Sequence, residues 1–221
     1  MTFNTTESKV PSKVPSRQTD LVDQSQRGHE RGSETNNQEL DQEQRMGYRK
    51  EQVVAVGDSN FKGLRCALVA SNIRRPVYVS KFAYHGATAS HIKHYIDVAL
   101  EKKPDILVIH AGTNDIWGSN KNNKRAEDIA GELIDTAIKA RQRGVRRIFI
   151  SSVLPVRNAE SNTRATDINS ILKLMCRDNE FQFIDNSNIT LEYLRKDDDV
   201  HLNGWGFREL ALNFAHYIDY E

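Results

Sequence analysis

The stretch DILVIHAGTND, residues 105–115, decides how this chain folds. It begins with a short apolar run rich in β-branched side chains, 105–110, and passes at once into the polar turn 111–115. A continuous apolar run of this length, closed by glycine and polar residues, is typical of a strand buried on both faces of a sheet. We therefore predict a buried strand over 105–110 with a polar loop at its carboxyl end.

Four similar runs occur elsewhere, separated by longer amphipathic stretches. The predicted strands are 52–56 (QVVAV), 77–82 (VYVSKF), 105–110 (DILVIH), 147–151 (RIFIS) and 181–184 (FQFI). The predicted helices are 62–70, 89–102, 125–143, 163–179 and 205–217. Strands that alternate with helices indicate an α/β fold, here a three-layer α/β/α sandwich with a five-stranded parallel sheet. Right-handed crossovers favour the flavodoxin-like strand order 2-1-3-4-5.

The first 46 residues differ from the rest in composition. Ser, Thr, Gln, Asn, Glu and Arg dominate this segment, and Phe3 is its only aromatic side chain. Such a segment buries too little apolar surface to offset the entropy of ordering, about 1–2 kcal/mol per residue for the backbone alone. We expect 1–46 to be a disordered polar tail and 47–221 to be the folded domain.

The composition argues against several classes of protein. Lys and Arg number 31 against 30 Asp and Glu, and a formal net charge of +1 gives no electrostatic case for a dedicated nucleic-acid binder. No run approaches the roughly 20 apolar residues that span a bilayer, and the first thirty residues contain no apolar signal region. Cys66 and Cys176 fit neither a disulfide framework nor a zinc site, and His91 and His94 lack a third ligand. We expect a cytoplasmic protein with reduced thiols and with no metal or organic cofactor.

Polar segments follow the predicted strands at the edge where a doubly wound sheet carries its active site. GDSN (57–60), YHGAT (84–88) and AGTND (111–115) follow the first three strands, and DDDVHLN (197–203) precedes the last helix. Each segment taken alone could be a turn with an N-cap, and His201 could be a surface histidine. Together they supply a nucleophile, hydrogen-bond donors and a base, which favours an acyl-transfer site.

These four segments resemble the sequence blocks of the SGNH (GDSL-type) hydrolases, over about 52–215. The residues that match the named positions of that family are Ser59, Gly86, Asn114, Asp198 and His201. The resemblance implies the SGNH-hydrolase form of the α/β/α fold. It also implies catalysis by a serine nucleophile.

The catalytic residues implied are Ser59, His201 and Asp198. His201 would accept the proton of the Ser59 hydroxyl, because a serine is a poor nucleophile until a base takes its proton. Asp198, three residues before the histidine, would accept the other ring N–H and fix the tautomer. Asp197 and Asp199 are rival partners for the histidine, but the spacing and the resemblance favour Asp198.

The expected oxyanion hole consists of the Ser59 and Gly86 backbone N–H groups and the Asn114 side-chain amide. Glycine at position 86 would let the backbone approach the substrate without a Cβ in the way. Asp58 would brace the turn by accepting backbone N–H bonds. Asn60 stands where the family's shorthand motif has Leu, and we expect this position not to touch the chemistry directly.

We predict a serine esterase that hydrolyses a carboxylic ester through an acyl-enzyme on Ser59. Few large apolar residues surround the motifs, so a short acyl group such as acetyl is expected. The small ester substrate could be a lipid or an acetylated carbohydrate.

The alternative is a binding module with little or no catalysis, which recruits RNA or protein. VGDSN (56–60) and IHAGTND (109–115) also resemble the esterase domain in first-open-reading-frame proteins of some non-LTR retrotransposons. That resemblance implies a cytoplasmic ribonucleoprotein in which an oligomer contacts RNA or a membrane. The chain shows no zinc knuckle and no convincing coiled coil, and its complete Ser-His-Asp set favours the enzyme.

Overall fold

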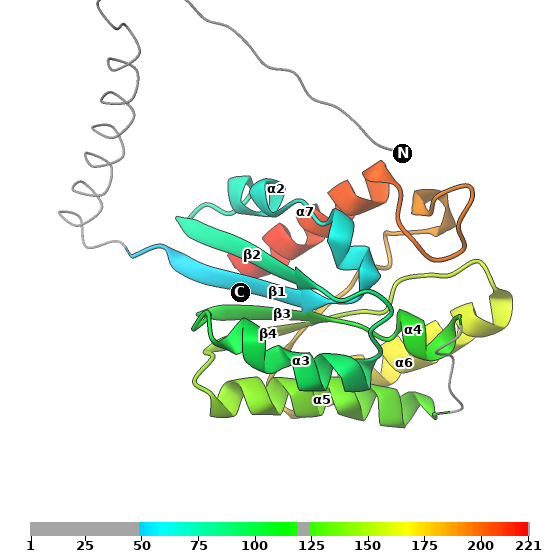
Figure 1. The fold of residues 1–221 in the computed structure, drawn as a ribbon, viewed down its shortest axis with the longest axis horizontal. Helices are drawn as coiled ribbons and strands as arrows, with labels where there is room; N and C mark the ends of the chain where they lie inside the picture. Colours follow the sequence, from blue (N-terminus) through cyan, green and yellow to red (C-terminus); the bar gives the residue numbers. More distant parts are fainter. Residues whose placement is uncertain (1–48, 119–123, 221) are drawn as a thin grey trace, which may run out of the picture. The chain divides into compact units, whose positions relative to one another are not determined.

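The computed structural model describes residues 49–118 and 124–220, so the predicted disordered tail lies outside the described residues. The strands are β1 (Glu51–Gly57), β2 (Val77–Ala83), β3 (Ile106–His110), β4 (Arg147–Ser151) and β5 (Gln182–Ile184). They form one parallel sheet in the order β2-β1-β3-β4-β5 (Figure 1). The predicted parallel sheet and its strand order are confirmed.

Helices cover both faces of the sheet, as predicted. The α-helices are α2 (Cys66–Ser71), α3 (Ala89–Leu100), α4 (Thr113–Ile116), α5 (Ala126–Gln142), α6 (Ala159–Asp178) and α7 (Gly204–Tyr220), and the 3-10 turns are η1 (Ser59–Gly63) and η2 (Leu191–Tyr193). Figure 1 shows α2 and α7 on one face and α3, α5 and α6 on the other. Among the helices of the described residues, none combines the length and the apolar character needed to cross a bilayer.

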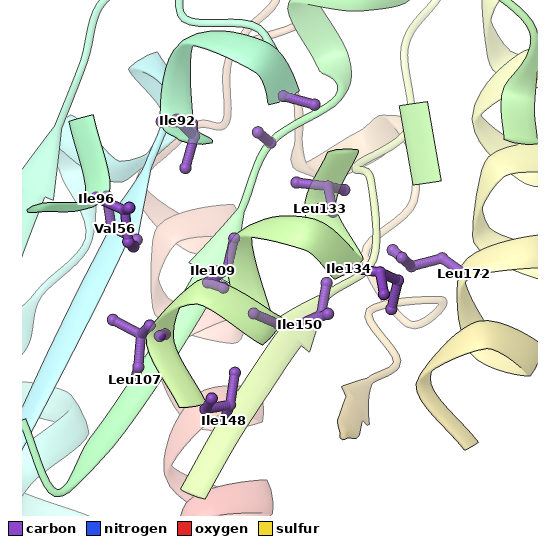
Figure 2. Close-up of a cluster of buried hydrophobic side chains, with 14 of the residues drawn as sticks. Val56, Ile92, Ile96, Leu107, Ile109, Leu133, Ile134, Ile148, Ile150 and Leu172 are labelled. Carbon is purple, nitrogen blue, oxygen red and sulfur yellow. The ribbon is translucent and has the colours of Figure 1, made fainter. Parts of the chain in front are cut away.

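Alternation along the strands divides the core into two clusters. In β1, Val54 and Val56 pack toward α3, α5 and α6, whereas Val53 and Ala55 pack toward α2 and α7. Successive side chains of a strand point to opposite faces, so a strand covered on both sides needs apolar residues at every position. Figure 2 shows the first cluster, in which strand residues meet Ile92 of α3 and other helix side chains.

The structure differs from the prediction at the first helix, expected over 62–70. The chain instead forms the 3-10 turn η1, extends at Leu64 (φ −60°, ψ 127°) and begins α2 only at Cys66. The Asp58 side chain caps η1 by accepting the Asn60 N–H, and Gly63 packs against the Phe207 ring where no Cβ would fit. Contacts with α7 therefore override the local helical pattern. The result is a tight turn directly after β1.

Candidate active site

The three predicted catalytic side chains lie in one hydrogen-bonded row. Ser59 Oγ is 2.9 Å from His201 Nε2, and His201 Nδ1 is 2.6 Å from Asp198 Oδ2. Ser59 begins η1 at the carboxyl end of β1, and His201 lies on the loop between η2 and α7. A carboxylate can only accept a hydrogen bond, so Nδ1 carries the proton and Nε2 accepts the Ser59 hydroxyl. This tautomer is the one that can remove a proton from serine.

Asp198 is held in place by the backbone of its own loop. Its Oδ1 accepts the N–H groups of Val200 and His201, each at 2.9 Å. Partial burial raises the pKa of Asp198, but these two bonds and the bond to the His201 ring outweigh it and keep the pKa below its ordinary value. The rival Asp197 pairs with Arg195 instead, at 3.2 Å. The aspartate that contacts His201 is therefore the one expected from the spacing.

Gly86 lies on the loop that follows β2, and Asn114 lies in α4, the short helix that follows β3. β2 and β3 are the strands on either side of β1. Gly86 has φ 66°, a left-handed conformation that favours glycine. Asn114 Nδ2 donates to the Ala87 carbonyl at 3.0 Å, so α4 is joined directly to the loop that bears Gly86. An amide nitrogen carries two N–H groups, and this bond uses one of them.

Asp115 was not predicted as a site residue, yet it joins the same two segments. Its side chain is fully buried, and its Oδ2 accepts the Ala89 N–H at 2.8 Å, at the first residue of α3. The carboxylate therefore joins the segment that bears Asn114 to the loop that bears Gly86. The sequence does offer a hint of this role, because Asp115 directly follows Asn114 at a strand-to-helix turn. Only the packed structure shows that it is buried.

Asp58 caps η1, the turn that begins at Ser59, as expected, and lies near the buried His110. Asp58 Oδ1 accepts the Asn60 N–H at 3.0 Å and is 4.0 Å from His110 Nε2. Burial raises the pKa of Asp58 to about 7; the Asn60 N–H and His201 oppose the rise, and Asp115 adds to it. Burial alone lowers the pKa of His110 to about 4. Both groups are therefore neutral over much of the range between these two values.

Asn60 holds the loop that carries His201, a contact that the sequence did not predict. Its carboxamide is buried and bonds to the main chain on both sides of His201. The only hint in the sequence was that a polar residue directly follows Ser59, at the start of a helical segment. Its partners lie 140 and 142 residues away, so the sequence could not identify them.

The remaining candidate ligands serve other purposes. His91 Nδ1 accepts the Thr88 N–H at 3.2 Å and completes the cap of α3. Cys66 and Cys176 are free thiols, and burial raises the pKa of both. In the described part of the chain, no three His, Cys, Asp or Glu side chains are grouped so that they could hold a metal ion.

Solved structures share this fold at low sequence identity. A GDSL-like lipase from Bacteroides thetaiotaomicron has a TM-score of 0.63 at 18% identity, over 76% of this chain and 87% of its own. An acetylxylan esterase from Geobacillus stearothermophilus has a TM-score of 0.64 at 16% identity, over 77% of this chain and 95% of its own. A carbohydrate acetylesterase from Sinorhizobium meliloti has a TM-score of 0.63 at 14% identity, over 76% and 98%.

Sequence comparison identifies the family directly. No curated protein is significantly similar to the chain. The sequence profile of the GDSL-like lipase/acylhydrolase family matches residues 47–208, which include every predicted site residue. Neither this match nor the structures above support the resemblance to retrotransposon proteins. The chain belongs to the GDSL-like lipase/acylhydrolase family.

Proposed function

We propose that this chain is a serine esterase that hydrolyses carboxylic esters of short acyl groups through an acyl-enzyme on Ser59. One observation carries the proposal: Ser59 Oγ, the His201 ring and Asp198 form an unbroken hydrogen-bonded row, with separations of 2.9 and 2.6 Å. These are the distances over which a base can take a proton from a nucleophile and a carboxylate can orient that base.

The first half of the reaction makes the acyl-enzyme. Ser59 Oγ attacks the ester carbonyl carbon while His201 Nε2 takes the hydroxyl proton, and Asp198 stabilises the resulting imidazolium. The carbonyl oxygen becomes an oxyanion, bound by the backbone N–H groups of Ser59 and Gly86 and by the Asn114 amide. When the tetrahedral intermediate collapses, the carbon–oxygen bond to the alcohol breaks. His201 returns its proton to the departing alcohol.

The second half releases the acid by the same route. A water molecule attacks the acyl carbon while His201 takes one of its protons. The bond to Ser59 Oγ then breaks, the proton passes back to this oxygen, and the carboxylic acid leaves. The chain is restored unchanged, and no cofactor takes part in the proposed steps.

The proposed substrates are small acetyl esters, with acetylated carbohydrates as the leading class. The loops that carry the site are built from small and polar residues, such as those of GDSN (57–60) and AGTND (111–115), which favours a short acyl group. Two structures with the same fold are an acetylxylan esterase and a carbohydrate acetylesterase. Their substrates support this choice of class.

The test compares wild type with Ser59→Ala on the acetyl and octanoyl esters of p-nitrophenol. We expect the variant to lose at least about 10³-fold in kcat, because the nucleophile is absent. Wild type should have the higher kcat/KM on the acetyl ester. Ser170→Ala is the matched control, because Ser170 is exposed and bonds only within α6, and it should retain full activity.

Two results would contradict the proposal. Equal hydrolysis by wild type and Ser59→Ala would show that the reaction does not pass through Ser59. A higher kcat/KM on the octanoyl ester would leave the nucleophile in place but reject the short acyl group.

A further inference from the structure

The side chain of Asn60 holds the loop that carries the catalytic histidine. Its Nδ2 donates to the Val200 carbonyl at 3.3 Å, and its Oδ1 accepts the Leu202 N–H at 3.2 Å. These two main-chain groups flank His201 directly. One carboxamide, 1% exposed, therefore holds the backbone immediately before and immediately after the base.

The two partners specify the kind of side chain required. A carbonyl oxygen can only accept, and a backbone N–H can only donate, so position 60 must present one donor and one acceptor a short distance apart. Leucine has a similar shape but neither group. Aspartate would accept from Leu202 but would set a carboxylate oxygen against the Val200 carbonyl, next to the buried Asp58.

The other end of Asn60 is fixed to the nucleophile turn. Its backbone N–H donates to Asp58 Oδ1 at 3.0 Å, and the Asp58 N–H donates to the His110 carbonyl of β3 at 3.3 Å. Ser59 therefore sits on a turn anchored in the sheet. The segment from Lys196 to His201 contains no helix or strand, so its position depends on bonds such as those from Asn60.

We propose that Asn60 is a positioning residue that sets the distance between nucleophile and base by joining the Ser59 turn to the backbone on both sides of His201. It acts through His201 and does not touch the substrate. This inference rests on the proposed function, in which His201 is the base for Ser59. Its consequence for catalysis is a lower kcat when the link is removed, with little change in KM.

The test uses Asn60→Leu and Asn60→Asp, assayed on p-nitrophenyl acetate. We expect kcat to fall by up to about 10²-fold in Asn60→Leu, because small displacements of a catalytic group have effects of this size. KM should change little. The second readout is the low-field proton NMR signal of the short His201–Asp198 hydrogen bond, which should shift or broaden in both variants.

Asn169→Leu is the matched control. Asn169 also grips the main chain at two points, since it accepts the Val153 N–H at 2.7 Å and donates to the Val153 carbonyl at 2.9 Å. Asn169→Leu therefore removes a similar pair of side-chain to main-chain hydrogen bonds. These bonds involve none of Ser59, His201 and Asp198. We expect lower thermal stability, with kcat and the His201 signal unchanged.

The outcomes separate this inference from the proposed function. If wild type depends on Ser59 but Asn60→Leu keeps its kcat and its NMR signal, the positioning role is wrong. If Ser59→Ala remains active, the proposed function fails, but the NMR signal still tests whether Asn60 positions His201. If Asn60→Leu does not fold, Asn60→Asp decides, and an unchanged signal in that variant overturns the inference.

Discussion

Asp58 and His110 are two buried residues whose pKa values shift in opposite directions. Burial raises the pKa of Asp58 from 3.8 to about 7 and lowers that of His110 from 6.5 to about 4. Between about pH 4 and 6.5 the unfolded chain would hold a proton on His110 and none on Asp58. The folded chain holds it on Asp58 instead. Folding therefore moves one proton from His110 to Asp58, next to Ser59.

This shift makes opposite predictions for Asp58→Asn and His110→Gln. The ionised Asp58 is disfavoured when folded, so wild type loses stability as the pH rises through 4 to 7. Asp58→Asn should therefore gain stability relative to wild type over this range, by up to about 4 kcal/mol. The protonated His110 is disfavoured, so His110→Gln should gain relative to wild type as the pH falls from 6.5 to 4, by up to about 3 kcal/mol.

The measurement is urea unfolding of the three proteins at several pH values between 4.5 and 7.5. The quantity to compare is the free energy of unfolding of each variant minus that of wild type at the same pH, because the contributions of the other titrating groups cancel in this difference. A difference in unfolding free energy that does not vary with pH would show that neither group is titrated by folding in the way described.

For single residues, the sequence predicted which side chains come together at the candidate site, but not which residues hold them in place. Ser59, Asp198 and His201 were expected from short segments, and the structure places them in contact. The roles of Asn60 and Asp115 depend on backbone groups from distant segments, which no local pattern identifies. The pKa shifts of Asp58 and His110 likewise depend on burial by the assembled sheet and helices.

At the scale of elements, strands were easier to predict than the segments between them. The β4 prediction, 147–151, matches the structure, and β1 is longer by one residue at each end. A buried strand is marked by its own apolar residues, so local sequence suffices. Helix α6 begins at Ala159 rather than Thr163, because the Asn158 side chain caps it by accepting the Ser161 N–H. Helix starts that are set by capping side chains or by contacts between distant segments are harder to predict from the sequence.

Gly112 gives a prediction about the α4 segment, which carries Asn114. It has φ 120°, and a Cβ there would lie 2.6 Å from Val153 Cγ2. Gly112→Ala should lower the free energy of unfolding by about 1–3 kcal/mol and should reduce kcat, because relief of the strain moves Asn114. Urea unfolding and hydrolysis of p-nitrophenyl acetate measure the two effects.

Gly131→Ala in the middle of α5 is the control for that substitution. Apart from its chain neighbours and the backbone of its own helix, no heavy atom lies within 4 Å of an added Cβ, and its φ is not positive. The variant should be more stable by about 0.5–1 kcal/mol, because alanine favours the helix, and its kcat should not change. If Gly112→Ala behaves like Gly131→Ala, the strained turn has no role in holding the site.

For the whole molecule, the strand order explains why the site lies where it does. β1 lies between β2 and β3, so the loops that follow these three strands meet at one edge of the sheet. This order could be predicted because right-handed crossover connections allow only a few strand orders in a parallel sheet. The placement of the His201 loop was not predictable in the same way, because it follows η2 rather than a strand of the sheet.

We further predict that a chain beginning at residue 47 folds and retains activity. Among the residues that the structure describes, 49–118 and 124–220, both hydrophobic clusters are formed by residues between Val53 and Ile218. Removal of 1–46 should therefore leave the thermal midpoint and kcat on p-nitrophenyl acetate unchanged. Calorimetry and steady-state kinetics on the two chains provide the check. Loss of cooperative unfolding in the shortened chain would show that the domain extends into the removed segment.

The proposed function requires that Ser59 form a covalent acyl-enzyme. The most direct measurement is treatment of the full chain with a serine-directed phosphonate, followed by mass spectrometry of its peptides. We expect a single modified peptide with the adduct on Ser59, and no adduct in Ser59→Ala. An adduct on another serine, or none in folded wild-type protein, would contradict it.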